Sequence, residues 1–218
     1  MNTIKLKMAC LIGILMMSYL SLCSKTTWSL RVGPSFSTFS FSDGASASYR
    51  TGFQLKVTGE DLIKNDLYSI FGYELTTKGH KETAEDGNVE TTPMYFQFSW
   101  HIGYKSNLTE SMRMVFHAGP YVAMGLAGKY KYDYTINSGP LHQSGTDEAN
   151  FFGTGDGDIN ANRWDFGLGA GVGLEFSKIL LDLGYDMGFI NVFGGSDSAF
   201  PGASAYNRNF YLTIGYKF

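Results

Sequence analysis

The segment of residues 163–176 constrains the fold more than any other part of this 218-residue chain. Its sequence, RWDFGLGAGVGLEF, is apolar at every even position and carries only glycine or charge at the odd positions. A period of two is typical of a β-strand, because successive side chains leave opposite faces. Glycines on the polar face suit a narrow, crowded interior, where they leave room for long polar side chains from opposite strands. The segment therefore predicts one strand of a barrel with a polar lumen.

The same alternation recurs along the chain. We expect eight strands, over residues 30–39, 49–58, 67–78, 92–105, 112–126, 163–176, 179–190 and 209–218. Pro120 lies inside the fifth of these and cannot donate to a ladder, so we expect a bulge or a local break there. The prediction is an all-β fold, an eight-stranded antiparallel up-and-down barrel.

The links between these strands alternate in length. Residues 59–66, 106–111 and 177–178 form short links, whereas 40–48, 79–91, 127–162 and 191–208 form long ones. Bacterial outer-membrane barrels show this asymmetry, with short periplasmic turns and long extracellular loops. The long links are polar and rich in Gly, Ser, Asp and Asn, which predicts mobile surface loops.

Alternation alone leaves open which face lies inside. A lipocalin-like barrel has an apolar interior and a polar exterior, and a membrane barrel inverts this. Aromatic residues at the predicted strand ends favour the membrane barrel, because they match the aromatic girdles found at membrane interfaces. They are Tyr104, Trp164, Tyr206, Phe210, Tyr216 and Phe218. We therefore expect a transmembrane barrel rather than a soluble barrel or sandwich.

The N-terminus has the plan of a cleaved signal peptide. Lys5 and Lys7 precede an apolar run over residues 8–22, and small residues follow. We assign residues 1–23 to the signal peptide and 24–218 to the barrel domain. A lipoprotein signal using Cys23 is the alternative, and the bulky Leu22 before that cysteine argues against it.

Composition excludes several classes of function. Both cysteines, Cys10 and Cys23, lie in the signal segment, so the mature chain has no thiolate site and no cysteine nucleophile. The net charge of −3 argues against nucleic acid as a partner. We expect no cofactor.

Charged residues on the polar faces would meet inside the barrel. An eight-stranded barrel is just wide enough for side chains to fill it, and buried charges must be paired. We favour a structural polar plug over an ion path. The predicted interior network comprises Arg50, Lys56, Glu74, Lys105, Arg163, Asp165, Glu175, Asp182 and Asp186.

Two weaker motifs bear on chemistry. Asp156, Asp158, Asn160 and Asn162 alternate as in a calcium loop, but Ala161 and Gly167 stand where that pattern needs glycine and glutamate. We therefore expect no metal site, with this segment as a weak calcium candidate. His101 and His117 face the predicted lumen, but no nucleophile motif accompanies them, so we expect no catalytic residues and no enzyme.

Three segments carry a family resemblance: 117–122 (HAGPYV), 180–185 (LLDLGY) and the closing 209–218 (NFYLTIGYKF). Together with the signal peptide they resemble the small outer-membrane β-barrels of the PorT-like and OmpA-like group of Bacteroidetes. The resemblance spans the mature chain and implies a location in the bacterial outer membrane. It also implies that Phe218 is the assembly signal read by the barrel-assembly machinery.

These observations lead to one functional hypothesis and two alternatives. The hypothesis is a monomeric, non-catalytic scaffold in contact with outer-membrane lipid. Its extracellular loops would serve envelope integrity, adhesion to host surface ligands, or contact with other envelope proteins. The alternatives are a lipid-modifying barrel enzyme and an accessory barrel of a secretion system.

Overall fold

The computed structural model describes residues 26–42, 44, 47–84, 87–138, 141–195 and 198–218. The predicted signal peptide, residues 1–23, lies outside the described residues. No helix in the described part is long and apolar enough to cross a membrane.

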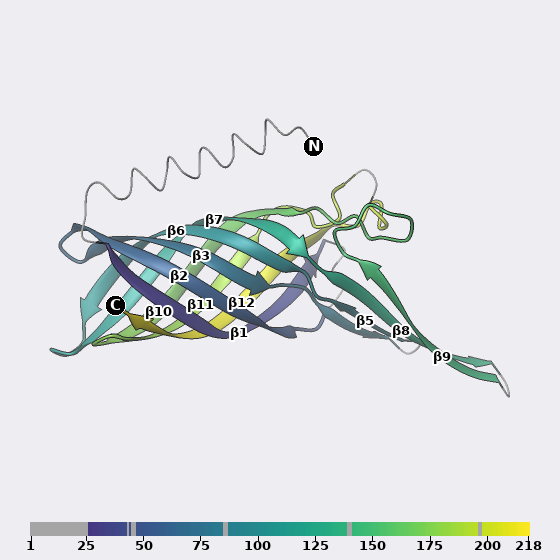
Figure 1. The fold of residues 1–218 in the computed structure, drawn as a ribbon, viewed down its shortest axis with the longest axis horizontal. Coiled ribbons are helices and arrows are strands. Elements are labelled where there is room, and N and C mark those ends of the chain that lie inside the picture. Colours follow the sequence, from purple (N-terminus) through teal and green to yellow (C-terminus); the bar gives the residue numbers. More distant parts are fainter. Residues whose placement is uncertain (1–25, 43, 45–46, 85–86, 139–140, 196–197) are drawn as a thin grey trace.

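The main body is a closed antiparallel barrel of eight strands, each hydrogen-bonded to its neighbours in the chain (Figure 1). β1 and β12 close the barrel, with Ser29 opposite Lys217 and Phe41 opposite Ala205. This confirms the predicted fold. The barrel strands are β1 (Thr27–Phe41), β2 (Arg50–Lys64), β3 (Leu67–Thr77), β6 (Met94–Asn107), β7 (Met112–Ala127), β10 (Trp164–Phe176), β11 (Ile179–Gly188) and β12 (Ala205–Lys217).

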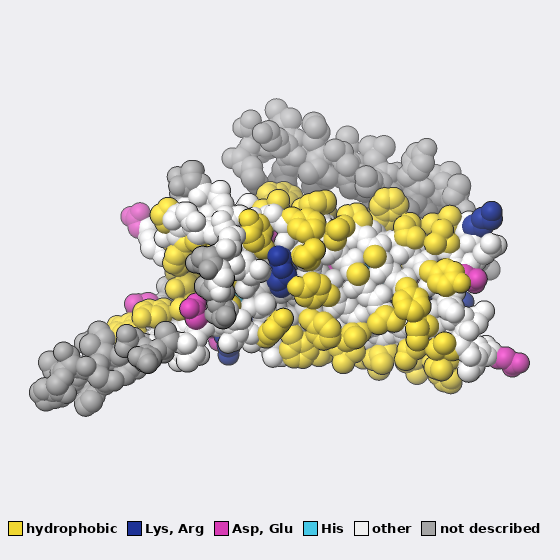
Figure 2. Space-filling view, turned by 180° about the vertical axis from the view of Figure 1, so that it is seen from behind, with side chains coloured by type: hydrophobic (Ala, Val, Ile, Leu, Met, Phe, Trp, Pro, Cys, Tyr) yellow, Lys and Arg dark blue, Asp and Glu magenta, His cyan; other side chains and the backbone are white. Residues whose placement is uncertain are grey.

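The two faces of the barrel wall are inverted relative to a soluble protein. On β10, Trp164 and Leu168 point outward with 55% and 48% of their surface exposed, whereas Asp165 and Glu175 point inward with 1% and 2%. Figure 2 shows apolar side chains covering the visible side of the barrel, with charged groups mostly toward its ends. The alternating pattern thus places apolar side chains on the outside, where they can face lipid, and polar side chains on the inside, as predicted.

One predicted short link is wrong. Residues 59–66 were expected to connect two strands, but β2 continues to Lys64 and leaves only Asn65 and Asp66 as the turn. Asn65 adopts a positive φ of 53°, a conformation that asparagine tolerates well. The polar run after Thr58 suggested a loop, but Glu60 is inside the barrel and 4% exposed.

Two long links also differ from the prediction of mobile loops. Strands β4 (Lys81–Ala84), β5 (Gly87–Thr91), β8 (Lys129–Ser138) and β9 (Leu141–Asn150) form a separate four-stranded antiparallel sheet, in the order β4-β5-β8-β9. This sheet extends beyond the end of the barrel opposite the C-terminus (Figure 1). We call these ends the sheet end and the terminal end.

Pro120 interrupts one ladder without a bulge. The pairing of β7 with β6 stops at Tyr121 opposite Ser99 and resumes at Ala118 opposite Ile102, in unchanged register. Because proline lacks an N–H, the local break is the expected result, whereas the alternative of a bulge at this site is wrong.

An aromatic plug fills the sheet end of the barrel. It is a buried apolar cluster in which Phe39 of β1 packs with Phe151, Phe152 and Phe193 from the segments that connect the strands. Tyr95 and Tyr121 extend the cluster from the barrel wall, and Phe152 packs edge-on against Tyr95 at 5.5 Å between ring centres. The two ends of the interior are therefore filled by different kinds of side chain.

Candidate functional site: the filled lumen and the sheet above it

A cluster of ion pairs fills the lumen near the terminal end. Glu60 of β2 and Glu175 of β10 both accept from the ammonium groups of Lys105 and Lys217, at 2.6 to 3.0 Å. Arg113 of β7 completes the cluster by pairing with Glu175. The residues come from β2, β6, β7, β10 and β12, so the cluster ties together strands all round the barrel.

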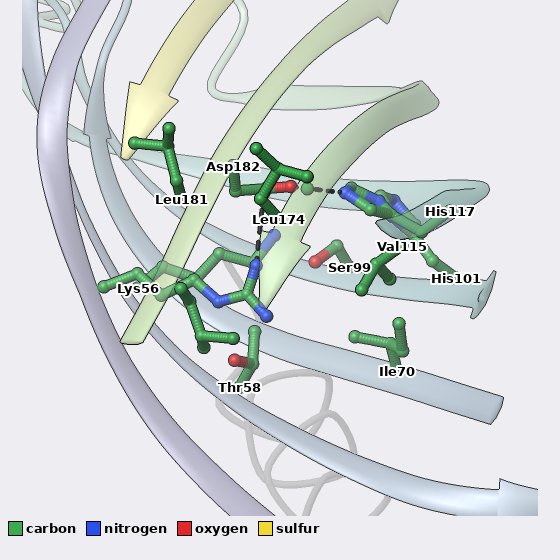
Figure 3. Close-up of a pocket in the computed structure, with 13 residues that line it drawn as sticks. Lys56, Thr58, Ile70, Ser99, His101, Val115, His117, Leu174, Leu181 and Asp182 are labelled. Atoms are coloured by element: carbon green, nitrogen blue, oxygen red, sulfur yellow. Dashed lines mark hydrogen bonds and ion pairs between the residues drawn. The ribbon is translucent and has the colours of Figure 1, made fainter. Parts of the chain in front are cut away.

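A chain of polar groups continues from this cluster toward the middle. Arg31 of β1 contacts Glu60 at 3.4 Å and Asp182 of β11 at 3.2 Å. The other oxygen of Asp182 lies 3.0 Å from Nε2 of His117, and the Nδ1 atoms of His117 and His101 are 2.8 Å apart (Figure 3). Arg31, His101 and His117 also line a void of about 10 Å³, room for about one water molecule. The void is far too small for a lipid or sugar substrate.

Two further groups fill the lumen toward the sheet end. Glu74 binds Lys56 at 2.8 Å and also accepts from Gln54 and Ser99. Higher up, Lys78 pairs with Asp165 at 2.8 Å, and its ammonium lies 4.5 Å from the ring centre of Tyr121. These residues mark the passage from ion pairs to aromatic packing.

The glycines of β10 make this filling possible. A Cβ on Gly171 would lie 2.6 Å from Nε2 of His117, and one on Gly169 would lie 2.6 Å from a carboxylate oxygen of Asp186. His117 and Asp186 sit on the strands that flank β10, directly opposite these glycines in the register. The long side chains thus come mainly from neighbouring strands, rather than from across the barrel as the sequence had suggested.

The structure places seven of the nine predicted network residues inside the barrel, each at most 4% exposed. They are Lys56, Glu74, Lys105, Asp165, Glu175, Asp182 and Asp186. Arg50 lies at the sheet end, where its Nε donates to Glu90 of β5 at 3.0 Å. Arg163 precedes β10 and is exposed, and its guanidinium donates to the carbonyl oxygens of Gly125 and Phe152. These two residues therefore do not join the network.

Five charged members of the filling were absent from the predicted network. They are Arg31, Glu60, Lys78, Arg113 and Lys217. Lys78 and Lys217 lie at inward-facing positions of the predicted alternation, so the alternation alone could have identified them. Glu60 was assigned to a link, and its role depends on three cations from β1, β6 and β12.

In the calcium candidate, side-chain oxygens of Asp158 and Asn162 accept hydrogen bonds from the protein's own backbone. Both carboxylate oxygens of Asp158 accept from nearby groups, one from the N–H of Asn150 and the other from the N–H of Gly155. Those backbone N–H groups lower the pKa of Asp158. Asn162 accepts from the N–H of Trp164, Asp156 is exposed, and Asn160 has a positive φ of 52°. Among the described residues no group of three or more His, Cys, Asp or Glu side chains could hold a metal.

The four-stranded sheet presents two different faces. Tyr130, Tyr132 and Tyr134 alternate along β8, and the rings of Tyr132 and Tyr134 stack at 5.9 Å. Their cross-strand neighbours are small at one end, because Gly87 and Gly145 flank Tyr134. The opposite face is charged and carries an exposed pair, Lys131 with Glu148, at 2.7 Å. We call the first of these the tyrosine face.

His80 joins the aromatic plug to the sheet. Its ring packs at a tilt against Phe39, at 4.5 Å between centres, and its Nδ1 lies 3.0 Å from the hydroxyl of Thr91. The imidazole is 4% exposed, and burial lowers the pKa of His80 to about 4. The side chain is therefore neutral at physiological pH and packs as an aromatic residue.

Comparison with known proteins agrees with this architecture. Residues 18–194 match the family model described as "Outer membrane protein beta-barrel domain". No curated protein matches the sequence. Similar solved structures include Ail of Yersinia pestis, with 19% identity, coverage of 88% of this chain and 98% of that one, and a TM-score of 0.42. OprG of Pseudomonas aeruginosa has 12% identity, coverage of 89% and 97%, and a TM-score of 0.49. Because the family model spans well over half of the sequence, this chain belongs to the outer-membrane protein β-barrel family and resides in the outer membrane.

Proposed function

We propose that this barrel is a non-catalytic scaffold that presents its four-stranded sheet at the cell surface for adhesion or for contact with other proteins. The observation that carries the proposal is the contrast between a lumen filled at every level and an ordered sheet outside it. Short turns of outer-membrane barrels lie in the periplasm, so the sheet would project outward from the cell. The tyrosine face suits contact with a partner, because tyrosine supplies large contact area and a polar tip.

The filled lumen supports a structural rather than a conducting role. Ion pairs occupy the terminal half, and the aromatic plug closes the sheet end. We expect planar-bilayer recordings of the purified protein to show no stable conductance. A large, steady conductance would contradict this part of the proposal.

The lipid-modifying alternative has less support. Its best residues, His101, His117 and Asp182, are at most 7% exposed and lie inside the lumen, away from the lipid-facing surface. Comparing lipid profiles of membranes with and without the protein tests this alternative directly. A modified lipid that depends on the protein would favour the enzyme.

Several finer predictions stay proposals. Phe218 follows β12, its N–H donates to the carbonyl of Trp28 at 3.0 Å, and its side chain is 68% exposed. This exposed position supports its proposed role as the signal for the barrel-assembly machinery. The monomeric state and the family relationship to PorT-like barrels of Bacteroidetes also stay predictions.

A site-specific cross-linking experiment tests the scaffold proposal. A photo-reactive residue replaces Tyr132 on the tyrosine face or, in a second variant, Tyr216 near the terminal end, and intact cells are irradiated. Surface presentation predicts protein adducts from position 132 that disappear when Tyr134→Ser is added. Tyr49→Ser is the matched control, because Tyr49 is an exposed tyrosine outside the sheet.

The same experiment separates the scaffold from the secretion accessory. Adducts only from position 216 would indicate a partner beside the terminal end of the barrel and would favour the accessory role. Adducts from neither position would contradict both.

A further inference from the structure

A groove opens on the outer surface of the barrel at the sheet end, where β7 runs on into β8. Its volume is about 560 Å³, within the range of about 300–1,000 Å³ typical of sites for small ligands. Its lining is mainly apolar, with Met94, Leu126, Ala127 and Phe152, and two cations, Lys129 and Arg163, also line it. The groove shares Phe152 with the aromatic plug, but none of the charged residues of the lumen lines it.

The divergence of two strands explains why a groove forms here. The ladder between β7 and β10 ends where Met124 pairs with Trp164. Beyond that point β7 carries one extra residue relative to β6, since Tyr95 pairs with Gly125 but Met94 pairs with Ala127. Such a bulge bends the strand. The chain then returns beside this bend, held by the N–H of Phe151 on the carbonyl of Gly128 at 2.9 Å.

The apolar part of the groove is continuous with the lipid-facing surface. Leu126, which lines the groove, is 40% exposed, and Met124 and Trp164 just below it are 37% and 55% exposed. All three belong to the outward row of their strands. The molecules that this surface meets are therefore membrane lipids, whose acyl chains lie next to the apolar side of the groove.

The two cations give the groove a positive charge that the protein offsets only at longer range, through the attraction of Lys129 to the nearby carboxylates of Glu148 and Asp158. Among the described residues, neither Lys129 nor Arg163 forms an ion pair with a carboxylate. Glu148, on the strand beside Lys129, is taken by Lys131, and the oxygens of Asp158 accept from backbone N–H groups. The guanidinium of Arg163 is fixed by the carbonyl oxygens of Gly125 and Phe152, at 3.2 and 2.7 Å.

We propose that this groove binds a phosphate-bearing lipid of the outer leaflet. An acyl chain would lie against Met94, Leu126 and Phe152, and the phosphate would lie between Lys129 and Arg163. The match is one of position and charge together, because the groove joins exposed apolar side chains to two cations that form no direct ion pair with a carboxylate among the described residues. Basic residues at such a surface attract anionic headgroups.

The test measures lipid retained by the purified full-length protein in detergent micelles, by native mass spectrometry. The probes are bisphosphorylated lipid A and the same lipid with both phosphates removed. We expect preferential retention of the phosphorylated form and a roughly five-fold loss of affinity in Lys129→Gln, the usual worth of one basic residue at a membrane surface. Lys64→Gln, which removes an exposed lysine at the opposite end of the barrel, should retain the lipid as the natural protein does.

A second variant tests the apolar half of the site. Ala127→Phe would fill the groove from an exposed position, and it should reduce retention of both forms of the lipid. Circular dichroism checks that each variant is folded, and Lys129→Gln keeps the test available if Ala127→Phe is not. Equal retention by Lys129→Gln and the natural protein would overturn the proposal. So would full displacement of the lipid by inorganic phosphate at the same concentration, because that would indicate a free anion site.

Discussion

The two halves of the barrel interior solve the same packing problem with different side chains. In the terminal half, Glu60 and Glu175 are surrounded by lysines and arginines, and each charge depends on the others. In the sheet half, Phe39, Phe151 and Phe193 fill space by volume and ring contacts. The comparison teaches that the ionic half should be sensitive to loss of charge, whereas the aromatic half should be sensitive to loss of size.

The largest effect is expected from removing one shared carboxylate. Glu60→Gln would leave Arg31, Lys105 and Lys217 with an uncompensated positive charge in a buried site. Breaking a buried pair in this way typically costs about 3–5 kcal/mol. Urea unfolding of the protein in lipid vesicles, followed by tryptophan fluorescence, measures the loss. A change smaller than that from truncating a plug phenylalanine would contradict the comparison.

A slightly smaller effect is expected from a cavity in the aromatic plug. Phe151 is fully buried, so Phe151→Ala should cost about 3 kcal/mol, at the lower end for such truncations because connecting segments can relax. Phe151→Leu is the matched variant, since it keeps most of the volume and should cost less. Unfolding in the same vesicles measures both. Equal losses would show that volume is not what the plug supplies.

The plug should also respond to acid through His80. Its pKa is lowered from 6.5 to about 4 by burial, so the unfolded state binds a proton before the folded state does. This contribution to stability is complete above pH 6.5 and is lost as the pH falls toward 4, with about 1 kcal/mol lost by pH 5.5. Unfolding at pH 7.5 and 5.5 measures it. In His80→Gln the part of the pH dependence that comes from this residue should disappear, and an unchanged slope would contradict the assignment.

The smallest effect is expected from an ion pair outside the barrel. Glu148 and Lys131 are both exposed on the charged face of the sheet, where water screens their attraction. Glu148→Gln should leave the unfolding midpoint unchanged within error. A loss comparable to that from Glu60→Gln would show that burial is not what distinguishes the two pairs.

The barrel could be predicted from sequence because lipid acts on every strand in the same way. A lipid-facing row such as Leu168, Val172 and Phe176 must be apolar, and this repeats in each strand whatever its partners are. The sheet outside the membrane lacks that constraint. Residues 130–134 alternate tyrosine with charge, a pattern typical of a strand, although the polar composition of 127–162 led to the prediction of a loop. The short strands β4 and β5 carry no comparable pattern.

The lumen was harder to predict, since a residue's position in the alternation shows that its side chain points inward but not which residue it contacts. Arg163 lies at an inward-facing position of the alternation, yet it precedes β10 and its guanidinium donates to backbone carbonyls. Glu60 follows a glycine and precedes an aspartate, a local pattern typical of a turn, and only the closed barrel brings its three cations together. Pairing of this kind is a property of the tertiary fold.

The glycine row of β10 also bears on how this barrel can diverge. Gly171 faces His117, and Gly169 faces Asp186, each as a direct partner in the register. The atoms nearest to a hypothetical Cβ on Gly169 all belong to side chains, so a larger residue at 169 requires a smaller one at 186, whereas at Gly171 the backbone carbonyl of Leu183 is also in the way. Substitutions at these positions should therefore appear as compensating pairs among natural relatives. Natural relatives would then conserve the summed size of the two paired side chains on neighbouring strands, rather than the identity of either residue.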